Sequence, residues 1–314
     1  MRAVWLREFG GPEVLALGEA PDPVPGEGQV LIEVAYANIT FVETQFRAGG
    51  QSPFRVELPV IPGNGVGGTV LATGPGVDPE LVGAKVISSL SGTGGYAELA
   101  VAAADTLHRV PAELPLDAAV ALLADGRTAA MLLGAVAVQP GERVLVEAAA
   151  GGVGSLLVQL ATAAGATVVA AAGGARKTEL AASLGAAEVV DYTEPGWTGR
   201  IGKVDAVFDG VGGEIGRDAF ELLGPGGRMI SYGLASGEWT GIPEETAAER
   251  GVTLVSLRPN PELVREATRQ VLAEAAAGRL RPVIGQRFPL AEAAAAHAAI
   301  AGRGTIGKTL LEVR

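Results

Sequence analysis

The pattern of hydrophobic and polar positions divides the chain near residue 140. Residues 1 to about 110 contain short apolar stretches of the β type, separated by segments rich in proline and glycine such as 21-PDPVPGEG-28 and 62-PGNGVGG-68. After Pro140 an apolar run at 143–149 is followed by apolar residues at helical spacing, namely Val153, Leu156, Leu157 and Leu160. An irregular, barrel-like β domain is therefore predicted to precede a domain of another kind.

The second domain alternates predicted strands with predicted helices. Further apolar runs lie at 167–172, 188–192, 204–209, 228–232 and 252–257, and helical segments separate them. This alternation is typical of βαβ units, which build a parallel sheet. Beyond the sheet, 261–280 is a long helix candidate and 287–313 adds a strand, a helix and a final strand. These elements are too few for a third domain, so we expect the C-terminal segment to return to the first one.

Composition supports a globular fold and restricts the partners. Hydrophobic residues make up 48% of the 314 residues and charged residues 19%, which favours a folded chain over a disordered one. The formal net charge of -11 argues against binding to nucleic acid or to anionic membranes, because both select basic faces. The apolar segments are too short or too polar for a signal peptide or a membrane span, so we expect a soluble, cytoplasmic protein.

The chain has no cysteine and two histidines, His108 and His297. Disulfides, thiolate zinc sites and a thiol nucleophile are therefore excluded. The two histidines are far apart in sequence and lack the spacing of a metal site, so each is expected to be an ordinary partly buried or surface residue. No metal site is predicted.

The segment 148-AAAGGVG-154 has the pattern of a dinucleotide-binding turn. It follows a predicted strand and opens a predicted helix, which is the context that this motif requires. Small residues at Ala149, Gly151 and Gly154 let the backbone approach a pyrophosphate, which binds the amides at a helix N-terminus. A tight turn without a ligand is the alternative interpretation.

The end of the next predicted strand indicates which dinucleotide binds. An NAD-selective site usually has an acid about 20 residues further on, whereas an arginine accommodates the 2′-phosphate of NADP. No acid occurs between Glu147 and Glu179, and the segment 173–177 ends in Arg176 and Lys177. We therefore expect NADPH as the cofactor. A solvated cationic helix start is the alternative interpretation of these two side chains.

Further motifs occur in a fixed order along the chain: 47-RAGG-50, 94-GGYAELAVA-102, 111-PAELPLDAAVALLADGRTAAMLL-133, 209-DGVGG-213, 226-GGRMISYGLASG-237 and 307-GKTLLEV-313. Together with AAAGGVG at 148–154 they resemble the medium-chain dehydrogenase/reductase superfamily, and within it the zinc-free, zeta-crystallin-like quinone oxidoreductases. The resemblance covers nearly the whole chain. It implies an α/β protein with a GroES-like irregular β-barrel domain plus a Rossmann domain with a doubly wound parallel sheet. The implied boundaries are 1–120 for the GroES-like substrate domain, 121–257 for the NADP(H)-binding domain and 258–314 for the C-terminal return to the substrate domain.

The resemblance also implies roles for individual residues around NADPH. The residues that it places at the pyrophosphate are Gly151, Gly152 and Val153. Those that it places around the 2′-phosphate, close to Arg176, are Gly173, Lys177 and Tyr192. Beside the nicotinamide it places Thr128 on one side, and Tyr232 and Gly233 on the other.

Two departures from the family pattern concern the substrate side. Asn64 and Gly65 stand where zinc-dependent members have histidine and glutamate ligands, so the resemblance carries over no metal. The family motif NFxDxYxR is replaced by 38-NITFVETQFR-47, which puts Thr40 at the asparagine position and Gln45 and Phe46 near the tyrosine positions.

Polar side chains are candidates for contact with the acceptor, because hydride transfer requires stabilisation of an oxygen on which charge develops. They are Thr40, Asn64 and Thr128, with Asn38 and Gln45 as weaker candidates and loop hydrogen bonding as the alternative role for each. Tyr96 is expected to pack between strands with its hydroxyl on the backbone. Glu43 is expected to titrate unusually if it is buried.

The leading hypothesis is an NADPH-dependent reductase that transfers a hydride to a quinone or an α,β-unsaturated carbonyl compound. The alternatives are reduction of an enoyl thioester or biosynthetic intermediate, and NADPH binding without catalysis. The expected partner is a small molecule. The apolar run 252–257 at the end of the sheet also leads us to expect a homodimer.

Overall fold

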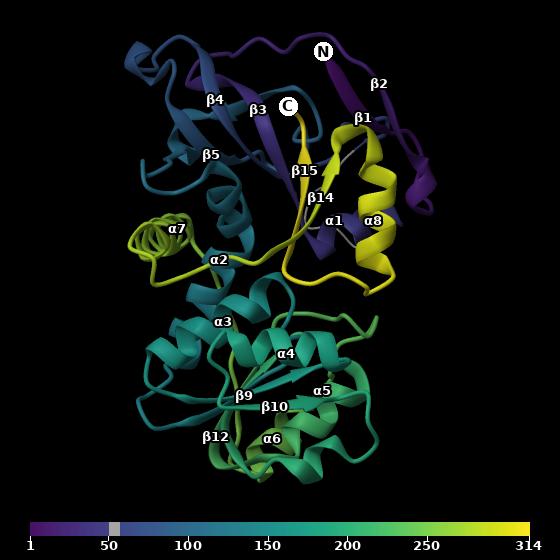
Figure 1. Cartoon of the computed structure of the whole chain (residues 1–314), viewed down its shortest axis with the longest axis vertical. Coiled ribbons are helices and arrows are strands. Elements are labelled where there is room, and N and C mark those ends of the chain that lie inside the picture. The colour runs from purple at the N-terminus through teal and green to yellow at the C-terminus, as the bar shows by residue number, and fades with distance from the viewer. Residues whose placement is uncertain (50–56) are drawn as a thin grey trace. The chain divides into compact units, whose positions relative to one another are not determined.

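The structure is a computed structural model that describes residues 1–49 and 57–314 (Figure 1). The chain forms two compact units, one made of residues 1–124 and 268–314 and the other of residues 125–267. The unit boundaries fall within helices α2 (Leu116–Val136) and α7 (Pro261–Ala276). Of the sequence motif 47-RAGG-50, the final Gly50 lies outside the described residues.

The unit at 125–267 contains a six-stranded sheet in which every pairing is parallel. Its strand order is β10-β9-β8-β11-β12-β13, so the order reverses between β8 and β11. This is the strand order of a Rossmann fold, and the predicted doubly wound parallel sheet is confirmed. The strands are β8 (Arg143–Val146), β9 (Thr167–Ala172), β10 (Glu188–Asp191), β11 (Val204–Asp209), β12 (Leu223–Ser231) and β13 (Thr253–Leu254).

The helices between these strands bury apolar faces. Helix α3 packs on β8 and β9 and buries Leu156 and Leu157 of the predicted apolar set, together with Ala161, whereas Val153 and Leu160 are half-buried. The core continues through Trp197 and Phe220. The other helices of this unit are α4 (Ala175–Ser183), α5 (Gly213–Phe220) and α6 (Glu244–Glu249), and α3 spans Gly152–Ala163.

Two predicted strands differ from the observed ones. Strand β8 ends at Val146 instead of residue 149, because the chain turns at once toward α3. Strand β13 has two residues where the apolar run at 252–257 predicts six. Pro259 and Pro261 follow shortly, and a proline cannot donate a ladder hydrogen bond. The homodimer expected from this strand stays a prediction.

The other unit is built on a curved, mostly antiparallel sheet. Within the described residues its order is β14-β15-β3-β4-β5-β7, and β6 also pairs with β3. Strand β3 alternates buried Val30, Ile32 and Val34 with more exposed residues, as a strand with one face on a core does. The strands are β3 (Gln29–Ile39), β4 (Gly65–Thr73), β5 (Lys85–Ser89), β6 (Leu99–Ala103), β7 (His108–Arg109), β14 (Ile284–Pro289) and β15 (Lys308–Glu312), with β1 (Arg2–Leu6) and β2 (Leu15–Glu19) as a separate pair.

The C-terminal strand belongs to this sheet. Strand β15 runs antiparallel to β3, with Thr309 opposite Ile39 and Glu312 opposite Tyr36. Helices α1 (Phe41–Arg47) and α8 (Ala293–Ala301) contact each other on the same unit. The inserted unit at 125–267 thus separates the C-terminal elements in sequence from the strands that they join.

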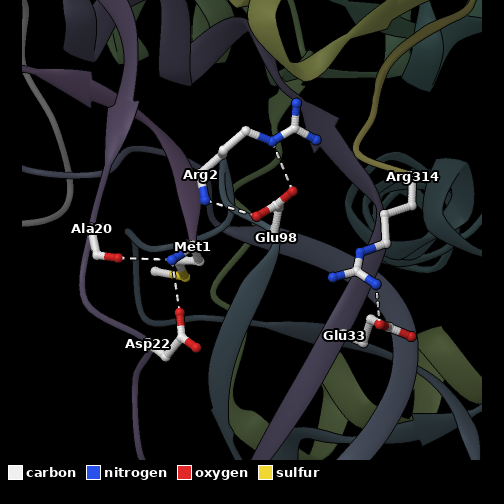
Figure 2. Close-up of polar contacts among 7 residues, drawn as sticks. All are labelled: Met1, Arg2, Ala20, Asp22, Glu33, Glu98 and Arg314. Atoms are coloured by element: carbon white, nitrogen blue, oxygen red, sulfur yellow. Dashed lines mark hydrogen bonds and ion pairs between the residues drawn. The ribbon is translucent and has the colours of Figure 1, made fainter.

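Ion pairs also connect residues at both ends of the chain to this unit (Figure 2). Arg2 donates from its backbone nitrogen (2.7 Å) and from Nε (2.9 Å) to the two carboxylate oxygens of Glu98. Arg314, next to β15, pairs with Glu33 of β3. Pairs as exposed as these contribute about 1 kcal/mol or less, so the sheet pairing itself holds the ends in place.

Helix α2 has 21 residues and is long and apolar enough to cross a membrane by length and composition alone. The expectation that every apolar segment is too short is therefore wrong for α2. More than half of its most apolar window is buried inside the protein, and it carries the charged residues Asp125 and Arg127. A core helix of a soluble protein has these same properties.

Candidate functional site

The predicted cofactor residues lie at one edge of the parallel sheet. Because the strands run in the same direction, their carboxyl ends lie together, and open sheets of this type bind ligands at that edge. The segments after β8, β9, β10 and β12 start there and contain 151–153, Gly173, Tyr192, Tyr232 and Gly233. The edge includes the point between β8 and β11 where the strand order reverses.

The turn between β8 and α3 is tight. Ala148 has a φ of 47°, which is uncommon for a residue with a side chain, and Gly151 caps the helix. A Cβ at Gly154 would lie 2.3 Å from the Ala148 carbonyl oxygen, so this packing requires glycine. The first amides of a helix have no intrahelical acceptor and favour an anion. The backbone at 151–153 therefore fits a pyrophosphate.

Two charged residues beside this turn were not singled out from the sequence. A Cβ on Gly152 would lie 1.9 Å from Oδ2 of Asp125, so this carboxylate faces the first turn of α3. Burial lowers the pKa of Arg127, and the charge of Asp125 opposes that shift. Both lie in the motif that contains Thr128, which is half-buried on α2. Two charged residues inside an otherwise apolar predicted helix are the sequence feature that could have identified Asp125 and Arg127 as candidate site residues.

The second predicted phosphate site lies where β9 ends. Gly174, with a φ of 88°, caps α4, and Arg176 and Lys177 fall in its first turn. Arg176 is exposed and Lys177 is half-buried. A Cβ on Gly173 would lie 3.2 Å from the ring of Tyr192, so these two predicted residues are neighbours. The arrangement combines two cations with a helix N-terminus.

An acid from the neighbouring strand reaches the same place. Asp191 ends β10 and accepts hydrogen bonds from the Gly174 nitrogen (2.9 Å), the Thr193 nitrogen (2.9 Å) and the Thr193 hydroxyl (2.6 Å). Burial alone would raise its pKa, but these hydrogen bonds outweigh burial and hold the pKa of Asp191 below its usual value. The sequence after the second strand, β9, contains no such acid, because Asp191 belongs to the third strand, β10.

Two fully buried carboxyl groups lie under the nucleotide turn, at the ends of β8 and β11. Neither oxygen of Glu147 has a hydrogen-bond partner among the described residues, whereas Asp209 accepts from the Gly212 nitrogen (2.7 Å) and the Thr240 hydroxyl. Burial first, and then the nearby charge of Asp209, raise the pKa of Glu147 well above its usual value. The Tyr232 hydroxyl donates to the Glu147 carbonyl oxygen (3.3 Å), and burial raises the pKa of Tyr232.

In the other unit, Glu43 connects two of the predicted acceptor residues. Thr40 caps α1 and donates to Oε2 of Glu43 from its backbone nitrogen (2.5 Å) and its hydroxyl (3.1 Å). The Asn64 nitrogen donates to Oε1 of the same carboxyl group (2.8 Å). Burial raises the pKa of Glu43, although these amides and the charge of Lys308 oppose the shift.

A buried tyrosine and histidine form a second polar pair in this unit. The Tyr96 hydroxyl lies 2.9 Å from Nε2 of His297, so the expectation that this hydroxyl meets the backbone is wrong. His297 is fully buried rather than partly exposed, and its Nδ1 has no partner among the described residues. Burial, helped by the charge of Arg47, lowers the pKa of His297 to about 3. The imidazole is therefore neutral at physiological pH.

The remaining acceptor candidates are dispersed. Asn38 is buried on β3, and a Cβ on Gly65 would lie 2.7 Å from its side-chain amide. Gln45 is half-buried on α1. Thr128 belongs to the unit at 125–267, whereas Thr40 and Asn64 belong to the other unit. The structure thus joins Thr40 with Asn64 and places Thr128 with the cofactor residues of its own unit.

Two family models match the chain. An alcohol dehydrogenase GroES-like domain matches residues 26–112, and a zinc-binding dehydrogenase domain matches residues 184–311. The GroES-like match confirms the predicted class of the β domain.

Known reductases, several of them named quinone oxidoreductase, are similar to this chain over its full length. The human quinone oxidoreductase is 35% identical, with 99% of this chain and 97% of that protein covered. A 2-haloacrylate reductase from Burkholderia is 33% identical, with 98% of each covered. The structure of the Escherichia coli quinone oxidoreductase complexed with NADPH superimposes with a TM-score of 0.91 at 30% identity, covering all of both chains.

The zinc that one family description implies does not fit these residues. The carbonyl oxygen of the Asn64 side chain accepts from the Leu90 (3.2 Å) and Gly92 (2.6 Å) nitrogens, and Gly65 offers no side chain. Among residues 1–49 and 57–314 there is no group of three or more His, Cys, Asp or Glu side chains that could hold a metal. No metal therefore enters the chemistry below.

One family assignment agrees with all of these findings: the Rossmann sheet, the GroES-like domain, the order of motifs and the full-length relatives. The chain belongs to the medium-chain dehydrogenase/reductase superfamily, in its quinone oxidoreductase family.

Proposed function

We propose that the protein is an NADPH-dependent reductase of quinones or α,β-unsaturated carbonyl compounds. The observation that carries the proposal is the cationic helix start at the end of β9, where Gly173 and Gly174 leave room and Arg176 and Lys177 supply positive charge. A 2′-phosphate is the part of NADPH that needs such a place. The similar Escherichia coli structure, which contains NADPH, supports the same choice.

The residues present fit the cofactor. The pyrophosphate would bind the amides of 151–153, and the 2′-phosphate would bind Arg176 and Lys177 beside Gly173 and Tyr192. The nicotinamide would lie by Thr128 and by the segment 232–233 after β12. When bound, NADPH supplies the hydride. The protein's own contribution is to orient the two reactants and to stabilise the charge that develops on the acceptor.

The acceptor oxygen would bind Thr40 and Asn64. Because the Asn64 carbonyl oxygen is occupied by two backbone amides, its NH₂ group remains as a donor toward a ligand. The Thr40 hydroxyl donates to the Glu43 carboxylate in this structure, and it becomes a second donor toward the acceptor when Glu43 is protonated and donates to it instead. Two donors directed at one oxygen stabilise the enolate or hydroquinone anion that hydride addition creates.

A second substrate class is a 2-substituted acrylic acid. The similarity to a 2-haloacrylate reductase, at 33% identity over 98% of the chain, supports reduction of an activated carbon–carbon double bond. The enoyl thioesters belong to the same chemical class. Panels of quinones, enones and acrylates, assayed by NADPH oxidation, separate these candidates. Tight NADPH binding without any turnover would favour a binding protein instead.

The cofactor assignment is tested by Lys177→Ala. Loss of a charge-assisted hydrogen bond of about 1.5–3 kcal/mol should weaken NADPH binding at least about 10-fold and leave NADH binding unchanged. The measurement is calorimetric titration with both cofactors. The matched control is Lys203→Ala, which removes the same charge at the amino end of β11, far along the chain from the phosphate residues. Equal weakening of both cofactors by Lys177→Ala would remove the 2′-phosphate assignment.

A further inference from the structure

Glu43 is placed unusually for a residue that caps a helix. It is the third residue of α1 and completes a capping box with Thr40, a role that glutamates normally fill in contact with water. Here the side chain is 7% exposed. Its second oxygen accepts the Asn64 nitrogen, from a segment 21 residues further along the chain. A helix cap alone requires neither the burial nor this second partner.

Polar and charged side chains and backbone amides surround Glu43. Thr40 and Asn64 donate to it, Lys308 of β15 approaches with a positive charge, and Tyr96 is a buried neighbour. Beyond Tyr96 lies the neutral His297 of α8, which feels the charge of Arg47. Burial outweighs these contacts and raises the pKa of Glu43. The carboxyl group is thus largely shielded from water, and this burial favours its protonated form.

The Thr40 hydroxyl is the group through which this proton can leave. A hydroxyl donates one hydrogen bond and accepts others, so Thr40 can accept from a protonated Glu43 while it donates to a ligand. The Asn64 side chain cannot do this, because an amide at neutral pH donates hydrogen bonds without releasing a proton. Of the two proposed acceptor contacts, Thr40 alone can therefore pass on a proton, and Glu43 lies 3.1 Å behind it.

We propose that Glu43 supplies, through the Thr40 hydroxyl, the proton that completes reduction of the acceptor. The inference rests on the proposed reductase function. The acceptor gains a hydride, which oxidises NADPH to NADP⁺ and leaves an oxyanion on the acceptor. The Thr40 O–H bond then breaks as its proton joins the oxyanion, and the Glu43 O–H bond breaks as its proton joins Oγ1 of Thr40. Glu43 becomes a carboxylate and is reprotonated from water before the next turnover.

The deciding variant is Glu43→Gln, which keeps the size and an acceptor oxygen but holds no transferable proton. Turnover should fall about 100-fold or more, as is typical when a general acid is lost. The dissociation constant of NADPH should stay within about 2-fold, because the cofactor residues lie in the other unit. The wild type should lose turnover as the pH rises and Glu43 deprotonates. The wild type should also turn over more slowly in D₂O, because a proton is transferred. The Glu43→Gln variant should show neither this solvent isotope effect nor the pH dependence.

An infrared titration provides a readout that does not depend on activity. The carbonyl stretch of a protonated, buried carboxyl group should be present in the wild type, disappear with rising pH, and be absent from Glu43→Gln. Thr44→Val is the control for damage to α1, because Thr44 is equally buried and its hydroxyl bonds only to the Phe41 carbonyl in the described contacts (2.7 Å). This control should keep the turnover, the pH profile and the infrared band.

A second pair of variants covers the case in which Glu43→Gln does not fold. Thr40→Val should lose turnover and its pH dependence while the carboxyl band still titrates, whereas Thr40→Ser should retain both. Unchanged turnover and pH profile in Glu43→Gln or in Thr40→Val would overturn the inference and leave the reductase proposal intact. A wild type that binds NADPH but reduces none of the acceptors would refute the proposed function, and this inference with it.

Discussion

Glu147 and His297 are both fully buried and both kept neutral by burial, but they affect stability in opposite pH ranges. Glu147 is an acid whose pKa is raised in the folded protein, so the native state holds a proton that the unfolded chain has lost. His297 is a base whose pKa is lowered, so the unfolded chain binds a proton that the native state refuses. Each residue therefore makes a distinct contribution to the pH dependence of unfolding.

Glu147→Gln should flatten the stability profile above about pH 4.5. Because native Glu147 keeps its proton, the free energy of unfolding of the wild type falls as the pH rises above the usual carboxyl pKa, by at most about 1.4 kcal/mol per pH unit. Glutamine carries no such proton, so the variant should gain on the wild type steadily with pH. Urea unfolding across a pH series measures the difference. Glu238→Gln, at an exposed site, is the control. Parallel profiles of wild type and Glu147→Gln would contradict this account.

His297→Gln should protect the protein against acid. The wild type should lose stability as the pH falls from about 6.5 toward about 3, again by at most about 1.4 kcal/mol per pH unit, because protons bind the unfolded histidine first. Glutamine can still bond to the Tyr96 hydroxyl but has no such titration. Thermal unfolding at successive pH values measures the effect, with His108→Gln on β7 as the control. If the stability of His297→Gln falls with decreasing pH as steeply as that of the wild type, this histidine is not the cause of the acid sensitivity.

At the scale of elements, the packing of α3 on the nucleotide turn depends on a missing side chain. Gly154→Ala would place a methyl group 2.3 Å from the Ala148 carbonyl oxygen. We expect a loss of about 1–3 kcal/mol in the free energy of unfolding and weaker NADPH binding, because the helix must move from the turn. Denaturant unfolding and calorimetry measure the two effects.

The matched control for that substitution is Gly134→Ala in α2. Gly134 is exposed, and a Cβ there would meet nothing within 4 Å. The same chemical change should therefore stabilise the protein by about 0.5–1 kcal/mol, the usual gain from alanine inside a helix. Equal effects at the two glycines would show that close packing at Gly154 is unimportant.

Sequence patterns predicted some elements better than others for identifiable reasons. The runs at 167–172 and 204–209 coincide with β9 and β11, because apolar residues predominate in each and no glycine or proline interrupts them. Strand β12 starts at Leu223 rather than residue 228, because Gly224, Pro225 and two further glycines hide its first half from any hydrophobic pattern.

Contacts within the candidate sites were harder to predict than the elements that carry them. The bond between Glu43 and Asn64 joins residues 21 apart, and the pair of Tyr96 and His297 joins residues 201 apart. Such contacts depend on how strands pair, which local periodicity does not encode. The position of Asp191 beside Gly174 has the same origin, since it follows from β10 lying next to β9.

At the scale of the whole molecule, each unit has its own hydrophobic core. Leu311 on β15 and Leu145 on β8 are both fully buried, each in the core of its own unit. Either residue changed to alanine should cost about 2–5 kcal/mol in its own unit. Leu311→Ala should leave the dissociation constant of NADPH unchanged, whereas Leu145→Ala should weaken NADPH binding, because cofactor binding is linked to the folding of its own unit.

Hydrogen exchange followed by mass spectrometry measures this separation peptide by peptide. Leu311→Ala should speed exchange in residues 1–49, 57–124 and 268–314, and saturating NADPH should slow exchange only in 125–267. At 100 times its dissociation constant NADPH should add about 2.7 kcal/mol to the unit that binds it. Equal slowing of exchange in both units would mean that cofactor binding couples them.

The pairing of β15 with β3 also orders events during protein synthesis. The edge of β3 at 36–39 meets its partner only after residues 309–312 have left the ribosome, long after β3 itself. The intervening unit at 125–267 is synthesised earlier and can fold while the other unit still lacks its last strands. Until then the nascent chain carries an unprotected strand edge. A fragment that stops before β15 would contain one folded unit and one sheet whose exposed edge can pair with other chains.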